Sequence, residues 1–131
     1  MPGLDTSRLR TSAGTVIAVA AGAIAGANLR FLAIGALTDA QGILLANVVG
    51  SFLLGLFVYW GGDDLVDRHT RLLVTTGFIS SLTTYSGFAI VTATGGDPLF
   101  TVAYVAGTYA LALTGVILGR ALAIRLRGEP A

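Results

Sequence analysis

The chain has 131 residues, of which 54% are hydrophobic and 11% are charged, with a formal net charge of +1 and a mean hydropathy of +0.81. This composition is far from that of a soluble domain and is typical of a protein that spans a membrane. Cysteine is absent, which excludes disulfides and thiolate metal sites. The net charge is too small to indicate a nucleic acid partner. Given the hydropathy, the expected surroundings are membrane lipid.

Four stretches are apolar enough to cross a membrane, since a spanning helix needs about 20 mostly apolar residues. They are residues 14–36, 42–60, 72–94 and 99–123. The connectors are short, so neighbouring helices are expected to run antiparallel in one bundle. The sequence therefore predicts an all-α integral membrane protein, with residues 1–131 forming a single four-helix transmembrane domain in the cell membrane.

Small residues recur every four positions in the first span, at Gly14, Ala18, Gly22 and Gly26. Such a ridge lets a second helix approach closely in lipid, where no hydrophobic force drives helices together. We therefore expect this face of the first span to pack against another helix.

Two polar residues of the first and second spans each have two interpretations. Arg30, near the end of the first span, is either an anchor that reaches the membrane interface or part of an electropositive vestibule for anions. Asn47, early in the second span, either hydrogen-bonds a neighbouring helix or faces a pore.

All acidic residues lie in the termini or connectors, so no span offers a carboxylate for coupling to protons or cations. They are Asp5, Asp39, Asp63, Asp64, Asp67, Asp97 and Glu129. This disfavours a proton-driven exporter. There is no nucleophile elbow, phosphate loop or histidine pair, so we do not expect an enzyme. The intramembrane donors are neutral apart from Arg30, and such a set suits an anion.

The connectors are interpreted as turns and helix caps, and not as binding sites. The acidic group around Asp67 is expected to be a solvated turn near the start of the third helix. In GGDP, residues 95–98, Asp97 is expected to cap the fourth helix and Pro98 to occupy its first position.

The third span contains an unusual run of hydroxyl groups. Seven of the twelve residues 75–86 are serine or threonine, and Tyr85 adds an eighth hydroxyl. Serine and threonine compete for backbone hydrogen bonds, and Gly77 and Gly87 flank the run, so the helix is expected to be interrupted here. At membrane depth such a break must be buried in protein or line a water-filled path, and it commonly binds ions.

In the fourth span, Tyr104, Thr108 and Ala112 share one face at a spacing of four, whereas Thr114 lies off it. The two hydroxyls on this face are candidates for a polar track. The alternative is that they bond the backbone of their own helix.

Three segments resemble a known family, the small dual-topology fluoride channels (CrcB or Fluc). GAIAGANLRF (residues 22–31) resembles its glycine-rich start ending in arginine and an aromatic residue. GILLANVVGSFLLG (residues 42–55) resembles its GTLxxNxxGSFxxG segment, and TTGFISSLTTYSGF (residues 75–88) resembles TTGFxGGxTTFSTF. The resemblance covers all four predicted spans, with the three motifs in family-like order and spacing.

This resemblance implies an antiparallel dimer with two fluoride pathways around a central structural sodium ion at the dimer interface. Carried over by position, the fluoride pathway would consist of Asn47, Tyr85, Ser86, Phe88, Tyr104 and Thr108. Arg30 would form the vestibule, and the backbone carbonyls of Ser80 and Thr83 would bind the sodium ion.

Three positions depart from the family pattern. Ser80 stands where the family has glycine, and serine resists the left-handed backbone angles that glycine accepts, so a break of different shape is expected. Tyr85 replaces a phenylalanine and adds a hydroxyl to the pathway. Gly87 replaces a threonine and removes a donor.

The distribution of the basic residues bears on which subunit this chain pairs with. Four spans put both termini and the middle connector on one side, which carries seven of the eight basic residues: Arg8, Arg10, Arg68, Arg71, Arg120, Arg125 and Arg127. The positive-inside rule then predicts one orientation, with both termini cytoplasmic. A chain that inserts in one orientation cannot form an antiparallel homodimer, so the partner is either a second copy of dual orientation or a homologous subunit of opposite orientation.

The sequence thus predicts a subunit of a fluoride-selective channel that exports fluoride passively and lowers cytoplasmic fluoride. Two alternatives are kept: a non-conducting membrane subunit of a heteromeric channel, and a small-solute exporter.

Overall fold

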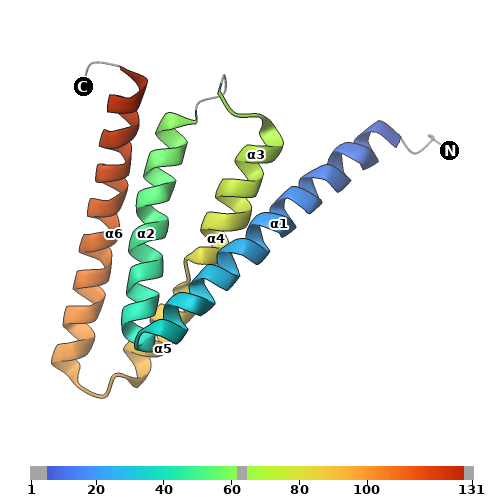
Figure 1. Cartoon of the computed structure of the whole chain (residues 1–131). Coiled ribbons are helices and arrows are strands. Elements are labelled where there is room, and N and C mark those ends of the chain that lie inside the picture. The colour runs from blue at the N-terminus through green and yellow to red at the C-terminus, as the bar shows by residue number, and fades with distance from the viewer. Residues whose placement is uncertain (1–5, 62–64, 129–131) are drawn as a thin grey trace.

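The computed structural model describes residues 6–61 and 65–128, with side chains from residue 13, and its regular elements in these ranges are all helical (Figure 1). In chain order they are α1 (Thr6–Ala36), α2 (Asp39–Trp60), α3 (Arg68–Leu72), the π-helical η1 (Leu73–Ile79), α4 (Ser80–Leu82), α5 (Tyr85–Thr94) and α6 (Pro98–Arg127).

Three of these helices contain segments long and apolar enough to cross a membrane, namely Ala13–Ala36 in α1, all of α2 and all of α6. The prediction of an all-helical, multi-pass membrane protein is confirmed. The residues expected to form a third span are divided among α3, η1, α4 and α5, the longest of which has 10 residues. In Figure 1, α3 and α4 follow one another between α2 and α1.

Side-chain caps define where the helices begin. Thr38 and Gln41 form a reciprocal capping box at the start of α2, with both hydrogen bonds at 3.4 Å. As predicted, the Asp97 carboxylate caps α6 by accepting from the Leu99 N–H at 3.0 Å, and Pro98 occupies the first turn.

Glycines bring α1 into backbone contact with η1 and α4. A Cβ on Gly22 would lie 2.1 Å from the Leu73 carbonyl oxygen, and one on Gly26 would lie 2.2 Å from the Phe78 carbonyl oxygen. Gly77 makes the reverse approach to the Val19 carbonyl oxygen. The predicted small-residue ridge is therefore a helix-packing surface.

The most extensive packing in the described chain joins α2 to α6. It too relies on glycines that leave no room for a side chain. A Cβ on Gly119 would lie 2.1 Å from the Phe52 carbonyl oxygen, and one on Gly55 would lie 2.4 Å from the Val116 carbonyl oxygen. Because the neighbouring atoms are backbone, a side chain at either glycine would push the two helices apart.

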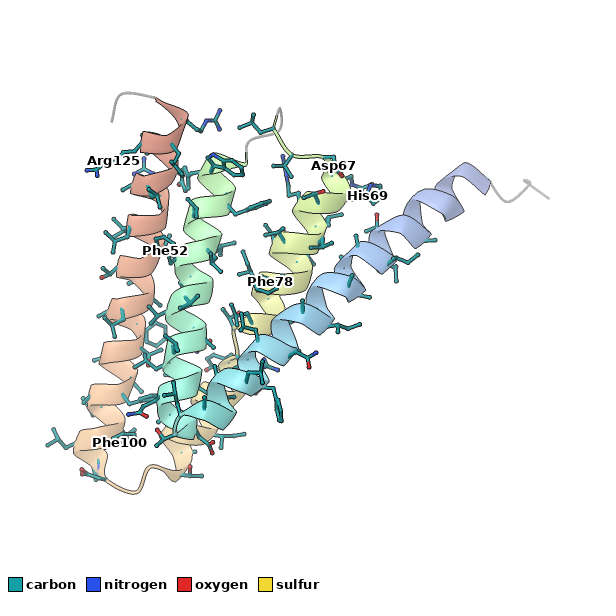
Figure 2. The ribbon with its side chains drawn as sticks, viewed as in Figure 1. Phe52, Asp67, His69, Phe78, Phe100 and Arg125 are labelled. Carbon is teal, nitrogen blue, oxygen red and sulfur yellow. The ribbon has the colours of Figure 1, made fainter. Side chains whose placement is uncertain are left out.

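The start of α1, the end of α6 and the turn into α3 lie at the same end of the bundle (Figure 1). Arginines tie α6 to α2 at this end. The Arg120 guanidinium carbon lies 5.1 Å from the centre of the Tyr59 ring, and Arg127 donates to the Tyr59 carbonyl oxygen at 3.2 Å. Figure 2 places Arg125, Asp67 and His69 at this end as well.

The described part of the acidic connector behaves as a helix cap. The Asp67 carboxylate accepts from the Thr70 hydroxyl and from the N–H groups of Thr70 and His69, and these bonds hold the pKa of Asp67 below its usual value. No group of three histidine, cysteine or acidic residues that could hold a metal ion occurs in the described ranges. Asp63 and Asp64 lie outside them.

Candidate functional site

A cavity of about 370 Å³, lined by apolar surface and a set of hydroxyl and amide groups, opens where η1, α4 and α5 meet α2 and α6. Its lining comprises Asn47, Gly50, Ser51, Leu54, Thr75, Ile79, Ser80, Thr83, Thr84, Tyr85, Phe88, Thr108, Tyr109 and Ala112. Six of the nine residues predicted for the site are in this set. Arg30, Ser86 and Tyr104 are not. The described lining contains no ionisable group except the two tyrosines, so its hydrogen-bonding groups are neutral.

The backbone is extended at two residues beside this cavity. Thr83 has φ −77° and ψ 156°, and Thr84 has φ −149° and ψ 125°. Helix α4 therefore ends at Leu82 and α5 begins at Tyr85. The Thr84 hydroxyl caps α5 by accepting from the Gly87 N–H at 3.1 Å. The positive end of the α5 dipole consequently adjoins the cavity.

Asn47 reaches this extended pair from α2. Its Oδ1 accepts from the Thr84 N–H at 2.7 Å, and its Nδ2 donates to the Thr84 carbonyl at 3.1 Å. Arg30 reaches it from α1, where Nη1 donates to the Thr83 carbonyl at 3.2 Å. The Asn47 side chain thus bonds a neighbouring segment and also lines the cavity, and the Arg30 guanidinium is directed toward the same segment.

The hydroxyl of Thr108 is the most unusual polar group in the cavity wall. Thr108 is 6% exposed, and its Oγ1 has no hydrogen-bond partner among the described residues. Two other hydroxyls on α6 do have partners. Thr114 donates to the Ala110 carbonyl of its own helix, and Tyr104 donates to the Ala40 carbonyl at 3.0 Å. A buried hydroxyl without a partner is costly unless a ligand or water satisfies it.

Aromatic rings surround Phe88, which is 8% exposed. Its ring stacks on Tyr104 at 5.8 Å and 21°, and meets the Tyr109 ring edge to face at 5.8 Å and 81°. Tyr85 is tilted against it at 6.0 Å. Ring edges carry partial positive charge, so this cluster is compatible with an anion.

Several polar residues of the predicted site lie on the outside of the described chain. Tyr85 is 76% exposed, and Ser80 and Ser86 are also exposed. The Ser86 hydroxyl lies 3.3 Å from that of Thr84. The aromatic pair therefore consists of a buried Phe88 and a largely uncovered Tyr85.

The carbonyls considered for sodium have suitable chemistry. The Thr84 N–H, which would bond Ser80 in a continuous helix, donates to Asn47, and Ser80 accepts from the Thr83 hydroxyl at 3.5 Å. A carbonyl oxygen has two lone pairs and is a ligand type that binds sodium at helix breaks, so the Ser80 oxygen fits the ion. The Arg30 charge at the Thr83 oxygen works against a cation there.

The backbone at Ser80 is helical, so the interruption begins after this residue. Ser80 has φ −63° and ψ −32°, an ordinary helical conformation, so no left-handed angle is required. At Gly87, a Cβ would lie 3.0 Å from both Ile43 Cδ1 and Thr84 Cγ2. The glycine therefore accommodates the packing of Ile43 against α5.

Sequence reasoning did not select Ser51, Thr75, Thr84 or Tyr109 as site residues, although all four line the cavity. Ser51 follows Asn47 by four residues in α2, so helical periodicity would have placed it on the same face. No comparable signal exists for Tyr109, because its position depends on how α6 packs beside α5.

The fold and the site define a class: a multi-pass helical membrane protein with a cavity of neutral hydrogen-bond donors and aromatic rings, and no carboxylate in the described cavity wall. The profile of a family described as "CrcB-like protein, Camphor Resistance (CrcB)" matches residues 17–120. The chain belongs to this family.

Three similar proteins carry names that specify a fluoride channel. "Fluoride-specific ion channel FluC 1" of Haloarcula marismortui is 46% identical over 107 residues, covering 81% of this chain and 83% of the relative. "Fluoride-specific ion channel FluC 2" of Halobacterium salinarum is 41% identical over 123 residues, covering 92% and 95%. "Fluoride-specific ion channel FluC" of Aquifex aeolicus is 36% identical over 123 residues, covering 83% and 99%.

Proposed function

We propose that the chain is a subunit of a fluoride-selective channel that exports fluoride passively across the cell membrane and so lowers cytoplasmic fluoride. The relatives named as fluoride-specific channels support the ion. The structural observation that carries the proposal is the buried, unpartnered hydroxyl of Thr108 in the wall of a cavity of neutral donors. This function involves no covalent chemistry and is not that of an enzyme.

The cavity offers what a dehydrated fluoride ion needs. Hydroxyl and amide hydrogens can replace the lost water, while ring edges and the start of α5 favour negative charge. A carboxylate would repel the ion, and none occurs in the described lining. The ion then moves down its own gradient, because the site has no titratable carboxylate to couple it to protons.

Replacing Thr108 by valine is expected to slow fluoride efflux from liposomes by about 10- to 100-fold, because a hydrogen bond to a charged group contributes about 1.5–3 kcal/mol. The isosteric change removes an unpartnered hydroxyl, so folding should be unaffected or improved. Thr114→Val is the matched control, since that hydroxyl bonds Ala110. If Thr108→Val and Thr114→Val show equal efflux, Thr108 is not part of the fluoride pathway.

We further propose that the extended pair Thr83–Thr84 is a break in a third membrane span, covered by a second subunit. The support is the exposure of Tyr85, Ser80 and Ser86 at a depth where polar groups are costly in lipid. The covering subunit would be an oppositely oriented partner, either a second copy or a homologue. The arginine-rich end, placed in the cytoplasm with both termini by the positive-inside rule, favours the homologue.

Sodium is proposed to bind between the two subunits, held by the carbonyls of Ser80 and Thr83 from each. If the partner is a second copy, the chain purified alone in detergent should be dimeric in sodium chloride and less so in N-methyl-glucamine chloride, as measured by light scattering. A dimer insensitive to sodium would contradict the ion site. A monomer in both salts would contradict the homodimer and leave the homologous partner, which co-expression then tests.

A further inference from the structure

The extended pair Thr83–Thr84 carries four backbone polar groups that a continuous helix would have satisfied. The Thr83 N–H still donates to the Ile79 carbonyl at 3.1 Å, in helical fashion. The other three have lost their helical partners. Buried backbone groups are almost always hydrogen-bonded, so the partners of these three groups determine whether the interruption is stable.

Two side chains from other helices provide all three partners. Asn47 on α2 bonds both the N–H and the carbonyl of Thr84, and Arg30 on α1 donates to the carbonyl of Thr83. The Asn47 bonds, at 2.7 Å and 3.1 Å, form a two-point contact that fixes the orientation of the Thr84 peptide groups. Each backbone group that leaves the helix is therefore bonded by a side chain from elsewhere in the chain.

The packing of α2 brings this contact about. Gly50 follows Asn47 by three residues in α2, and a Cβ there would lie 2.3 Å from Thr83 Cγ2. Because Gly50 has no side chain, Thr83 lies directly against α2. This close approach brings Thr84 within hydrogen-bond distance of Asn47. The clamp thus depends on the close approach of two segments as well as on the two polar side chains.

We infer that Asn47 and Arg30 are positioning residues that clamp Thr83–Thr84 in the extended conformation, and thereby fix where α5 begins. Thr84 caps α5 and both Tyr85 and Phe88 follow within its first turn, so the clamp sets the place of the cavity's aromatic wall. This gives the Asn47 amide a role at the backbone of the interruption in addition to its place in the cavity wall. The inference rests on the proposed function only for its effect on transport.

The test is amide hydrogen exchange at Thr84 and Gly87, measured by NMR on the full chain in detergent or nanodiscs. Asn47→Leu removes both bonds at nearly constant volume and should speed exchange at these amides by about 10- to 100-fold, because the Thr84 N–H loses its acceptor. Thr108→Val, which alters the same cavity without touching the clamp, should leave exchange at both amides unchanged.

Arg30 gives a second pair of variants. Arg30→Met removes the donor to the Thr83 carbonyl and should speed exchange at Thr84, whereas Arg30→Lys keeps a donor and should speed it less. If Asn47→Leu does not fold, this pair decides the question. Wild-type exchange in Asn47→Leu or in Arg30→Met would overturn the clamp.

Fluoride efflux from the same variants separates the two roles of Asn47. Slowed efflux with wild-type exchange would assign Asn47 to contact with the ion and reject positioning. Slowed efflux together with fast exchange supports the clamp. Exchange requires no fluoride, so a wild-type chain that fails to transport fluoride would contradict the proposed function while the clamp is still tested.

Discussion

Replacing Phe88 by isoleucine is expected to reduce fluoride efflux by about tenfold or more. The Phe88 ring contacts Tyr85, Tyr104 and Tyr109, so its loss removes the ring that the aromatic wall is built around. A loss of about 1.4 kcal/mol at the barrier corresponds to a factor of ten in rate. Isoleucine also lacks the positive ring edge that favours an anion. Efflux from liposomes, with chloride as the comparison ion, measures the effect.

Phe100→Ile is the matched control. Phe100 stacks on the other side of the aromatic cluster, 5.7 Å from Tyr104, but it does not line the cavity. The same chemical change there should leave efflux within about twofold of wild type, since it alters packing and not the pathway. If both variants transport at the wild-type rate, or if both lose transport equally, the cavity around Phe88 is not the ion pathway.

The largest effect on stability is expected at the contact between α2 and α6. Gly119→Ala places a Cβ that would lie 2.1 Å from the Phe52 carbonyl oxygen and 2.7 Å from the Leu56 nitrogen. Backbone atoms cannot rotate away, so the helices must separate, at a cost of about 1–3 kcal/mol or more. Thermal or denaturant unfolding of the purified chain should show a clear decrease in stability.

Gly107→Ala on the same helix provides the control, because a Cβ at Gly107 meets nothing within 4 Å. Alanine is the better helix former, so this change should be neutral or stabilising in the helix. A Gly119→Ala variant as stable as Gly107→Ala would mean that α2 and α6 do not approach as closely as described.

The hydropathy pattern by itself determined that the chain is a helical, multi-pass membrane protein, because a spanning helix must satisfy its own backbone and expose apolar side chains to lipid. Local chemistry likewise predicted the Asp97 cap, and the spacing of Gly22 and Gly26 predicted a packing face. These features depend on neighbours in the sequence, and helical periodicity is sufficient to read them.

Tertiary structure decided what each polar side chain does. From the sequence, Thr108 and Thr114 were both able to bond their own helix, yet only Thr114 does so in the described chain. The two interpretations of Asn47 differed in what lay opposite it, and the structure places both the backbone of Thr84 and the cavity there. Tyr109 was not selected, because its contact with Phe88 joins α6 to α5.

The physical reason is the range of the interactions. Capping and amphipathic spacing act within a turn or two of helix, so the sequence alone expresses them. A hydrogen bond between residues 37 apart, as between Asn47 and Thr84, exists only when close packing brings the two segments together. The sequence determined which hydrogen-bonding groups enter the membrane, and the packing of α1 and α2 decided which of them hold the backbone and which face the cavity.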